Sequence, residues 1–235
     1  MKMIARIVFV SVLAASATPA LLAATSPVTG AVDTIEWKAS NAERLKAMFP
    51  NAAAVAALDR RTAPSDYDAD SDNIGDFRVV NLNNDGNLQV VCLVDVTGRA
   101  WYTEVIIFSQ HSGTIVRSTI STGGANISSL DKRLVDLRHD GQKELLLPRW
   151  LGPYKGAAQP LATFTDVYRF DGQRALRVNQ EFSDYYRKTE LPRLHSELDA
   201  LMKLAGAGEP AVEAARQEQR AAIQQEIDEI HNTIQ

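Results

Sequence analysis

The sequence predicts an α+β protein that is mainly antiparallel β, with helices at the N-terminal end and a helical hairpin at the C-terminal end. Between Phe77 and Phe182, short runs rich in Val, Ile, Leu, Tyr and Phe alternate with turn pairs such as Asp-Gly and Ser-Gly, which is typical of antiparallel strands. On both sides of this stretch, apolar residues recur every three or four positions, which indicates helices.

The segment 25–65 is expected to form two short helices ahead of the sheet region. Ser40 and Glu43 have the spacing of a capping box, which predicts the start of the first helix. Pro50 interrupts the helical pattern, and Asn51 is expected to cap a second, alanine-rich helix.

The β domain, 66–182, contains an internal repeat. The segment 80–91 lines up with 135–146, because their Asp-Gly pairs lie 55 residues apart. Further on, 105–108 lines up with 167–170 at a separation of 62, and the inserted loop 151–160 accounts for the difference. Two four-stranded copies, about 77–120 and 132–181, follow from this spacing, and a period of this size is typical of propeller blades. The predicted strands lie near 77–81, 88–95, 100–109 and 114–120 in the first copy, and near 132–137, 143–149, 161–170 and 174–181 in the second.

The segment 183–235 predicts a helical hairpin that packs on something. Leucines at three- and four-residue spacing from Leu191 give one apolar stripe, with Thr189 as the expected N-cap and Pro192 in the first turn. A second helix is expected from Pro210 to the end of the chain. A short coiled-coil contact is the alternative interpretation of its isoleucine stripe.

Residues 1–24 have the order of a cleavable signal peptide. Lys2 and Arg6 precede an apolar run over 7–13, and small residues follow it. Cleavage is expected after Ala23 or Ala24, with Ala20 as the alternative. We therefore expect an exported protein without a transmembrane segment in its mature form, located in the periplasm, with release into the medium as the alternative.

Composition narrows the class of partner. Without residues 1–24 the chain keeps 23 basic and 29 acidic side chains, which does not supply the basic field that nucleic-acid binding needs. Cys92 is the only cysteine, so no internal disulfide is expected, and its apolar neighbours predict a small buried residue.

The two Asp-Gly segments resemble FG-GAP repeats, also called VCBS-like repeats, over about residues 77–182. That family carries an Asp-x-Asn-x-Asp-Gly-x-x-Asp/Glu turn followed by an apolar strand. The resemblance implies β-propeller blades, calcium binding at the turns, an extracellular location and a role in adhesion or ligand binding. The matching positions are Asn81, Asn83, Asp85 and Gln89 in the first copy, and Asp136, Arg138, Asp140 and Glu144 in the second.

Two departures from the family pattern matter. Closed propellers take about 4 to 8 blades, so two copies leave sheet faces open, and either the terminal helices or a homodimer must cover them. The ligand positions are also depleted in carboxylates, and Arg138 adds a positive charge. The Asp-Gly pairs are therefore expected to survive as hairpin turns rather than as calcium sites.

The better calcium candidate lies in the loop expected over 66–76. Its carboxylates stand at loop positions 1, 3, 5 and 9, a spacing that suits a hard cation, and Ile74 would add a backbone oxygen. The bidentate Glu expected at position 12 is replaced by Val79. A solvated acidic linker is the alternative. The predicted metal ligands are Asp68, Asp70, Asp72 and Asp76.

The sequence indicates only the general class of function. No nucleophile, metalloprotease or phosphate-loop motif is present, and the four histidines are scattered. The predicted ligand-binding residues for a protein or carbohydrate partner are Trp150, which lies beside the inserted loop, and Tyr154, which lies in it. We expect an exported, non-enzymatic binding protein. The alternatives are a small periplasmic enzyme with a site built from dispersed residues, and a structural envelope protein that docks through its C-terminal helices.

Overall fold

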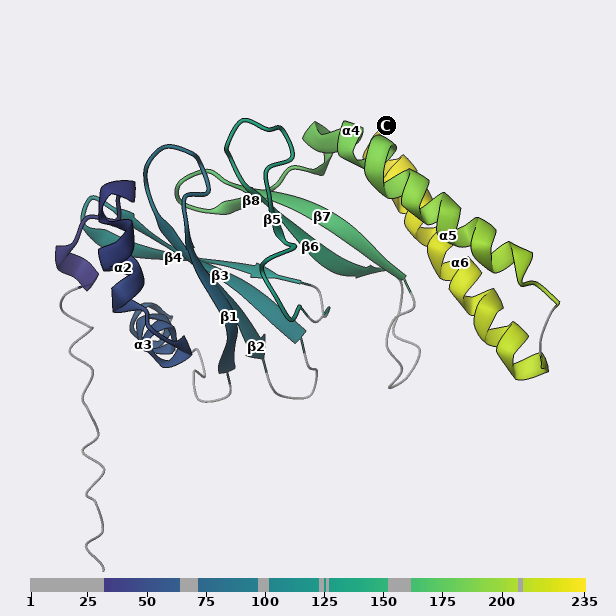
Figure 1. Ribbon diagram of the computed structural model, residues 1–235, viewed down its shortest axis with the longest axis horizontal. Helices are drawn as coiled ribbons and strands as arrows, with labels where there is room; N and C mark the ends of the chain where they lie inside the picture. The colour runs from purple at the N-terminus through teal and green to yellow at the C-terminus, as the bar shows by residue number, and fades with distance from the viewer. Residues whose placement is uncertain are drawn as a thin grey trace, which may run out of the picture.

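The computed structural model describes residues 32–63, 72–96, 102–122, 125, 127–151, 162–206 and 209–235. Two four-stranded antiparallel sheets stand between helices from the two ends of the chain (Figure 1), so the predicted α+β class is confirmed. The first sheet consists of β1 (Asp72–Val80), β2 (Gln89–Val96), β3 (Tyr102–His111) and β4 (Thr114–Ser121). The second consists of β5 (Leu134–Val135), β6 (Glu144–Leu151), β7 (Ala162–Phe170) and β8 (Ala175–Arg177).

The helices lie outside the two sheets. At the N-terminal end are η1 (Ala39–Asn41), α2 (Ala42–Met48) and α3 (Ala52–Thr62). After β8 come η3 (Asn179–Phe182), α4 (Ser183–Tyr185), the π-helical turn η4 (Tyr186–Glu190), α5 (Leu191–Lys203) and α6 (Pro210–Thr233).

Alternation along the central strands places apolar side chains on both faces of the first sheet, because successive residues of a strand point to opposite sides. One face packs against the N-terminal helices through Val90, Cys92, Val94, Ile106 and Phe108. The residues between them, Val91, Leu93, Val105 and Ile107, pack against Leu145, Leu147 and Phe170 of the second sheet. Cys92 is fully buried and free, as predicted, and burial raises the pKa of its thiol.

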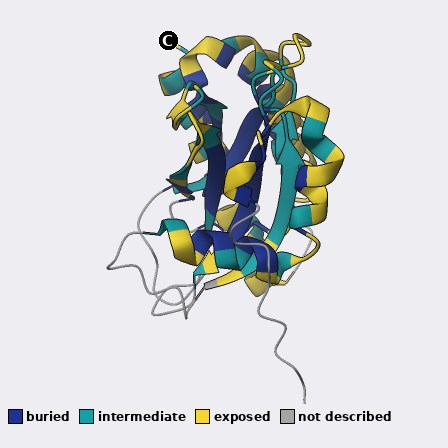
Figure 2. Cartoon of the chain, turned by 90° about the vertical axis from the view of Figure 1, so that its left-hand side faces the viewer, coloured by how far each residue is buried: buried dark blue, intermediate teal, exposed yellow. Residues whose placement is uncertain are grey.

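The remaining face of the second sheet is covered by the C-terminal helices. Leu146, Phe164 and Val167 pack against Tyr186, Leu194, Ile223, Ile227 and Ile230. The result is a four-layer arrangement of helices, sheet, sheet and helices, and Figure 2 shows buried residues concentrated in the strands between the helical layers. The sequence predicted that helices at both ends could close two open sheets, and these contacts confirm it.

The internal repeat is visible in the backbone as well as in the sequence. Gly86 and Gly141 both have positive φ, 80° and 85°, at the 55-residue separation of the Asp-Gly pairs. The residues two positions earlier, Asn84 and His139, also have positive φ. Both Asp-Gly pairs therefore form turns of one shape, because glycine adopts this conformation without strain.

Each turn is closed by the same side-chain hydrogen bond. The Gln89 carbonyl accepts from the Leu82 N–H at 2.8 Å, and the Glu144 carboxylate accepts from the Leu137 N–H at 3.1 Å. Strand pairing corrects one detail of the sequence alignment. The pairing of β6 with β7 follows the same register as the pairing of β2 with β3. The third strands of the two copies therefore correspond at a separation of 60 residues rather than 62.

The start of β1 differs from the sequence prediction. The acidic loop was expected to run to Asp76, but pairing with β2 extends the strand back to Asp72. A register irregularity between Ile74 and Asp76 interrupts this pairing, at Gly75.

Helix starts were predicted with mixed success. Asn51 caps α3 as expected, because its side chain accepts from the Ala54 N–H at 3.1 Å. The capping box at Ser40 and Glu43 is wrong: the chain forms η1 across Ser40, and Glu43 pairs with Lys46 instead. Thr189 is not an N-cap, because it lies inside a continuous helical stretch in which a π-turn precedes Pro192. Proline has no N–H to donate, so a widened turn at this point is physically reasonable.

The edge of β7 is the least regular part of the second sheet and the most informative. β8 pairs only with Tyr168–Phe170, so among the described residues no strand lies along that side of the preceding half of β7. Groups from the segment after β8 bond to its backbone instead. At Val167, the N–H donates to the Asn179 side chain at 2.7 Å, and the carbonyl accepts from the Val178 N–H at 2.8 Å. The Thr165 carbonyl accepts from the Tyr186 hydroxyl at 2.7 Å. The Thr163 N–H donates to the Glu226 carboxylate at 2.9 Å.

Asn179→Ala should therefore be strongly destabilising. It leaves the buried Val167 N–H without its acceptor and removes a donor from the buried carboxylate of Asp166. We expect a loss of about 2–4 kcal/mol in the free energy of unfolding, measured by urea denaturation. Gln180→Ala, a truncation of the exposed neighbour, is the control and should change stability by less than about 0.5 kcal/mol. Equal losses in the two variants would contradict this account of the β7 edge.

Candidate functional site

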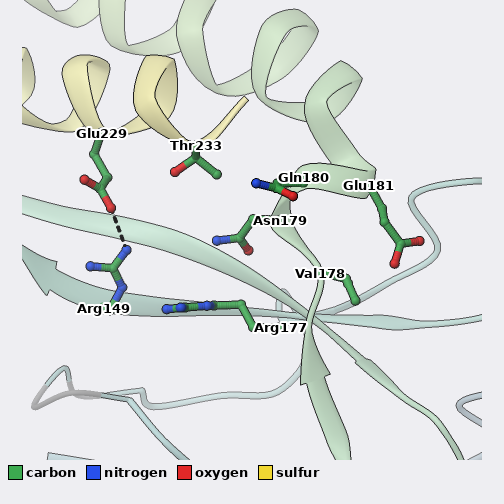
Figure 3. Close-up of a pocket in the computed structure, with 8 residues that line it drawn as sticks. All are labelled: Arg149, Arg177, Val178, Asn179, Gln180, Glu181, Glu229 and Thr233. Atoms are coloured by element: carbon green, nitrogen blue, oxygen red, sulfur yellow. Dashed lines mark hydrogen bonds and ion pairs between the residues drawn. The ribbon is translucent and has the colours of Figure 1, made fainter. Parts of the chain in front are cut away.

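A polar groove of about 570 Å³ lies between the second sheet, the segment after β8 and the end of α6 (Figure 3). Its volume falls within the range of about 300–1,000 Å³ that ligand pockets occupy. We call it the β7-edge groove. Its lining residues are Arg149, Arg177, Val178, Asn179, Gln180, Glu181, Glu229 and Thr233.

A buried carboxylate organises one wall of this groove. Asp166, in the middle of β7, is only 1% exposed. One of its oxygens accepts from Arg149 Nε at 2.8 Å and the other from Asn179 Nδ2 at 2.7 Å. A buried charge is tolerated only when it is paired and hydrogen-bonded, and both oxygens of Asp166 meet that requirement.

Arg149, on β6, is held from two sides. Besides Asp166, its guanidinium donates through Nη2 to Glu229 of α6 at 2.9 Å (Figure 3), and it lies over the Phe164 ring at 5.2 Å. Burial opposes the charge, but the hydrogen bonds to Asp166 and Glu229 outweigh it and raise the pKa of Arg149. Its guanidinium is therefore a fixed, permanently charged donor that joins the sheet to α6.

The second arginine of the groove is held much more loosely. Arg177, at the end of β8, has a side chain that is 56% exposed, and its Nη1 lies 3.9 Å from the Asp166 carboxylate. This is an ion contact beyond hydrogen-bonding distance. Within the described part of the chain, the guanidinium of Arg177 therefore makes no hydrogen bond.

Glu181 separates the β7-edge groove from a second cavity of about 610 Å³. Its carboxylate accepts from Arg169 at 2.9 Å and from Arg138 at 3.0 Å, and both guanidiniums lie over the Phe182 ring. The hydrogen bond from Arg169 is the main cause that lowers the pKa of Glu181. Arg138, which matches a calcium-ligand position of the FG-GAP motif, serves as an ion-pair partner here.

Glu144 is a buried charge near the site whose hydrogen bonding is incomplete. It is fully buried, and within the described part of the chain its second oxygen has no hydrogen-bond partner. The nearest cation is Arg169, whose Nε lies 3.8 Å away. Burial raises the pKa of Glu144 because the charged form loses water without full compensation.

The predicted ligand-binding residues lie elsewhere or outside the described residues. Trp150 is half-buried in β6, opposite Thr163, and is not among the residues that line the β7-edge groove. Tyr154 lies outside the described residues. The binding role of this pair stays a prediction.

The predicted calcium ligands are described only in part. Asp68 and Asp70 lie outside the described residues, and only the backbone of Asp72 is described, at the start of β1. The Asp76 carboxylate accepts from Arg78 and from the Leu130 N–H, so protein donors already occupy both of its oxygens. In the described ranges, no three His, Cys, Asp or Glu side chains gather as a metal site. Calcium binding stays a prediction.

Sequence reasoning missed the residues that form the groove. The signal was present: Asp166 interrupts the apolar alternation of the strand predicted over 161–170, and Arg149 ends the strand predicted over 143–149. Opposite charges on neighbouring strands suggest a pair. The contributions of Asn179 and Glu229 depend on how the C-terminal helices dock, which no local pattern encodes.

Comparisons with protein-family models, curated proteins and solved structures give no match for this chain. Among the helices that the structure describes, none is both long enough and apolar enough to cross a membrane.

Glu144→Gln should change how stability depends on pH. The pKa of Glu144 is raised on folding, so the wild-type protein loses stability as pH rises from the ordinary Glu value through the folded-state value. Glutamine keeps an acceptor for the Leu137 N–H, as Gln89 does in the first copy. We therefore expect urea denaturation to show that Glu144→Gln is more stable than wild type, by a margin that grows as pH rises above the ordinary Glu pKa.

Glu181→Gln is the control of opposite sign. The pKa of Glu181 is lowered on folding, so its stabilising contribution is present above the ordinary Glu value and is lost as pH falls. This variant should be less stable than wild type at neutral pH, with a gap that closes in acid. Parallel pH profiles for wild type and Glu144→Gln would contradict the raised pKa of Glu144.

Proposed function

We propose that this protein is an exported, non-enzymatic binding protein, built on two FG-GAP-like units, that holds a small polar ligand in the β7-edge groove. The observation that supports this proposal is the pair of arginines on either side of buried Asp166. Arg149 is fixed by two carboxylates, whereas Arg177 is more than half exposed. Arg149 provides a rigid wall of the groove, and Arg177 provides hydrogen-bond donors for a ligand.

Rigidity of the wall favours binding. The groove side chains come from β6, the end of β8, η3 and α6, and hydrogen bonds between these elements hold them in place. A site whose groups are fixed before the ligand arrives loses less conformational entropy on binding. The first sheet and the N-terminal helices would then serve as the scaffold beneath the second sheet.

Export is the second part of the proposal, and it depends on residues 1–24, which lie outside the described residues. The resemblance to FG-GAP repeats also supports an extracytoplasmic location. The two alternatives stated from the sequence, a periplasmic enzyme and a structural protein docking through the C-terminal helices, remain predictions.

Expression of the full chain in a Gram-negative host should yield a shortened periplasmic protein. Mass spectrometry should find an N-terminus at Ala24 or Thr25, because cleavage is expected after Ala23 or Ala24. The same chain without residues 1–24 is the control and should stay in the cytoplasm. Recovery of the uncleaved full chain from the cytoplasm would contradict export.

The groove is tested with Arg177→Ala against Arg174→Ala. Both arginines are exposed and lie close together in the chain, but only Arg177 lines the groove. In equilibrium dialysis against a low-molecular-weight cell extract, mass spectrometry should find a compound that wild type and Arg174→Ala retain and Arg177→Ala loses. Retention of the same compounds by all three proteins, or of none by wild type, would count against the groove as a binding site.

A further inference from the structure

We infer that the ligand of the β7-edge groove is a neutral, polyhydroxylated molecule, a sugar of one or two rings. This inference rests on the proposed function and adds the chemical class of the ligand.

Several polar groups at the groove already make hydrogen bonds within the protein. Both oxygens of Asp166 accept hydrogen bonds, and Asn179 uses its carbonyl on the Val167 N–H and one of its amide N–H groups on Asp166. These bonds hold the groups in place and shape the groove. A ligand would find its main partners among the groups that make no such bond.

The remaining groups combine donors and acceptors. In the described part of the chain, the side chains of Arg177, Gln180 and Thr233 make no hydrogen bond to other residues, and all three line the groove (Figure 3). A guanidinium only donates, whereas an amide or a hydroxyl does both. Glu229 adds a carboxylate that Arg149 engages through one oxygen.

The charge of the lining is balanced. Arg149 and Arg177 face the carboxylates of Asp166 and Glu229, and Glu181 is matched by arginines of its own outside the groove. An anionic ligand would compete with Asp166 for Arg177, and a cationic ligand would approach two guanidiniums. A neutral ligand avoids both repulsions and leaves the ion pairs intact.

Sugar hydroxyls suit this set of partners. Each hydroxyl donates one hydrogen bond and accepts others, so adjacent hydroxyls on a ring can accept from Arg177 and donate to Glu229 or Gln180. A groove of about 570 Å³ has room for one or two sugar rings. Val178 is the only apolar side chain among the described lining residues, so little C–H surface is buried and the dissociation constant should be on the order of 0.1–1 mM.

The test is a binding panel by saturation-transfer NMR and calorimetry on the mature protein. The neutral probes are glucose, galactose, mannose, N-acetylglucosamine, maltose and cellobiose, and the matched acidic probes are glucuronate and galacturonate. We expect at least one neutral sugar to bind, with an affinity that changes less than about twofold between about 0.05 and 0.5 M NaCl, because no net charge is neutralised. Arg177→Ala and Thr233→Val should each weaken binding at least about fivefold, and Arg174→Ala should not.

The possible results separate this inference from the proposed function. Binding of the acidic sugars alone, with an affinity that falls as salt rises, would overturn the neutral class while keeping the groove as a binding site. A dialysis ligand that Arg177→Ala loses but that carries no hydroxyl groups would have the same consequence. Neutral sugars that bind equally well to Arg177→Ala would place sugar binding outside the groove and overturn the inference.

Discussion

The unpaired half of β7 is the constraint on which the rest of the second sheet depends. A strand edge must satisfy its outward N–H and C=O groups, and β8 reaches only the last three residues of β7. Asn179, Tyr186 and Glu226 bond to the remaining edge through their side chains. Those bonds fix where the chain leaves the sheet and how the C-terminal helices cover its outer face. Because Asn179 also holds Asp166, the same edge orients Arg149 and forms one wall of the groove.

Comparison of the two repeats explains how the second comes to contain the β7-edge groove. In the first copy, β4 pairs with β3 from Glu104 to His111, so the corresponding edge has a strand along most of its length. In the second copy the partner strand is the short β8, and polar side chains bond to the rest of the β7 edge. Two interior positions also differ between the copies. By strand pairing, Gln89 of the first copy corresponds to Glu144 of the second, and Ser109 corresponds to Arg169. The second sheet carries buried Asp166 and Glu144 in its central strands, where the first sheet has Ile106 and Gln89.

The features that the sequence predicted are those with a local cause. Strand alternation, the Asp-Gly turns and the apolar stripes of the terminal segments indicated two sheets covered by helices, and Asn51 indicated a cap. The failures have tertiary causes. Pairing with β2 draws Asp72 into a strand, and the long helical stretch after β8 absorbs Thr189 in a π-turn. The groove residues lie on four separate elements, and their meeting depends on the angle at which α6 crosses β7.

The energetics of the Asp166 network argue for a role beyond holding the sheet together. Burying a carboxylate and a guanidinium costs several kcal/mol of desolvation, and well-packed apolar residues often serve as well or better. A longer β8 would satisfy the same backbone edge through strand pairing, as β4 does in the first copy. What the network adds is a set of polar groups fixed in place around a solvent-filled groove, with Arg177 left available beside them. Fixed hydrogen-bonding groups facing solvent are useful to a binding site and costly to a scaffold, and this contrast supports our proposal that the second sheet holds a ligand.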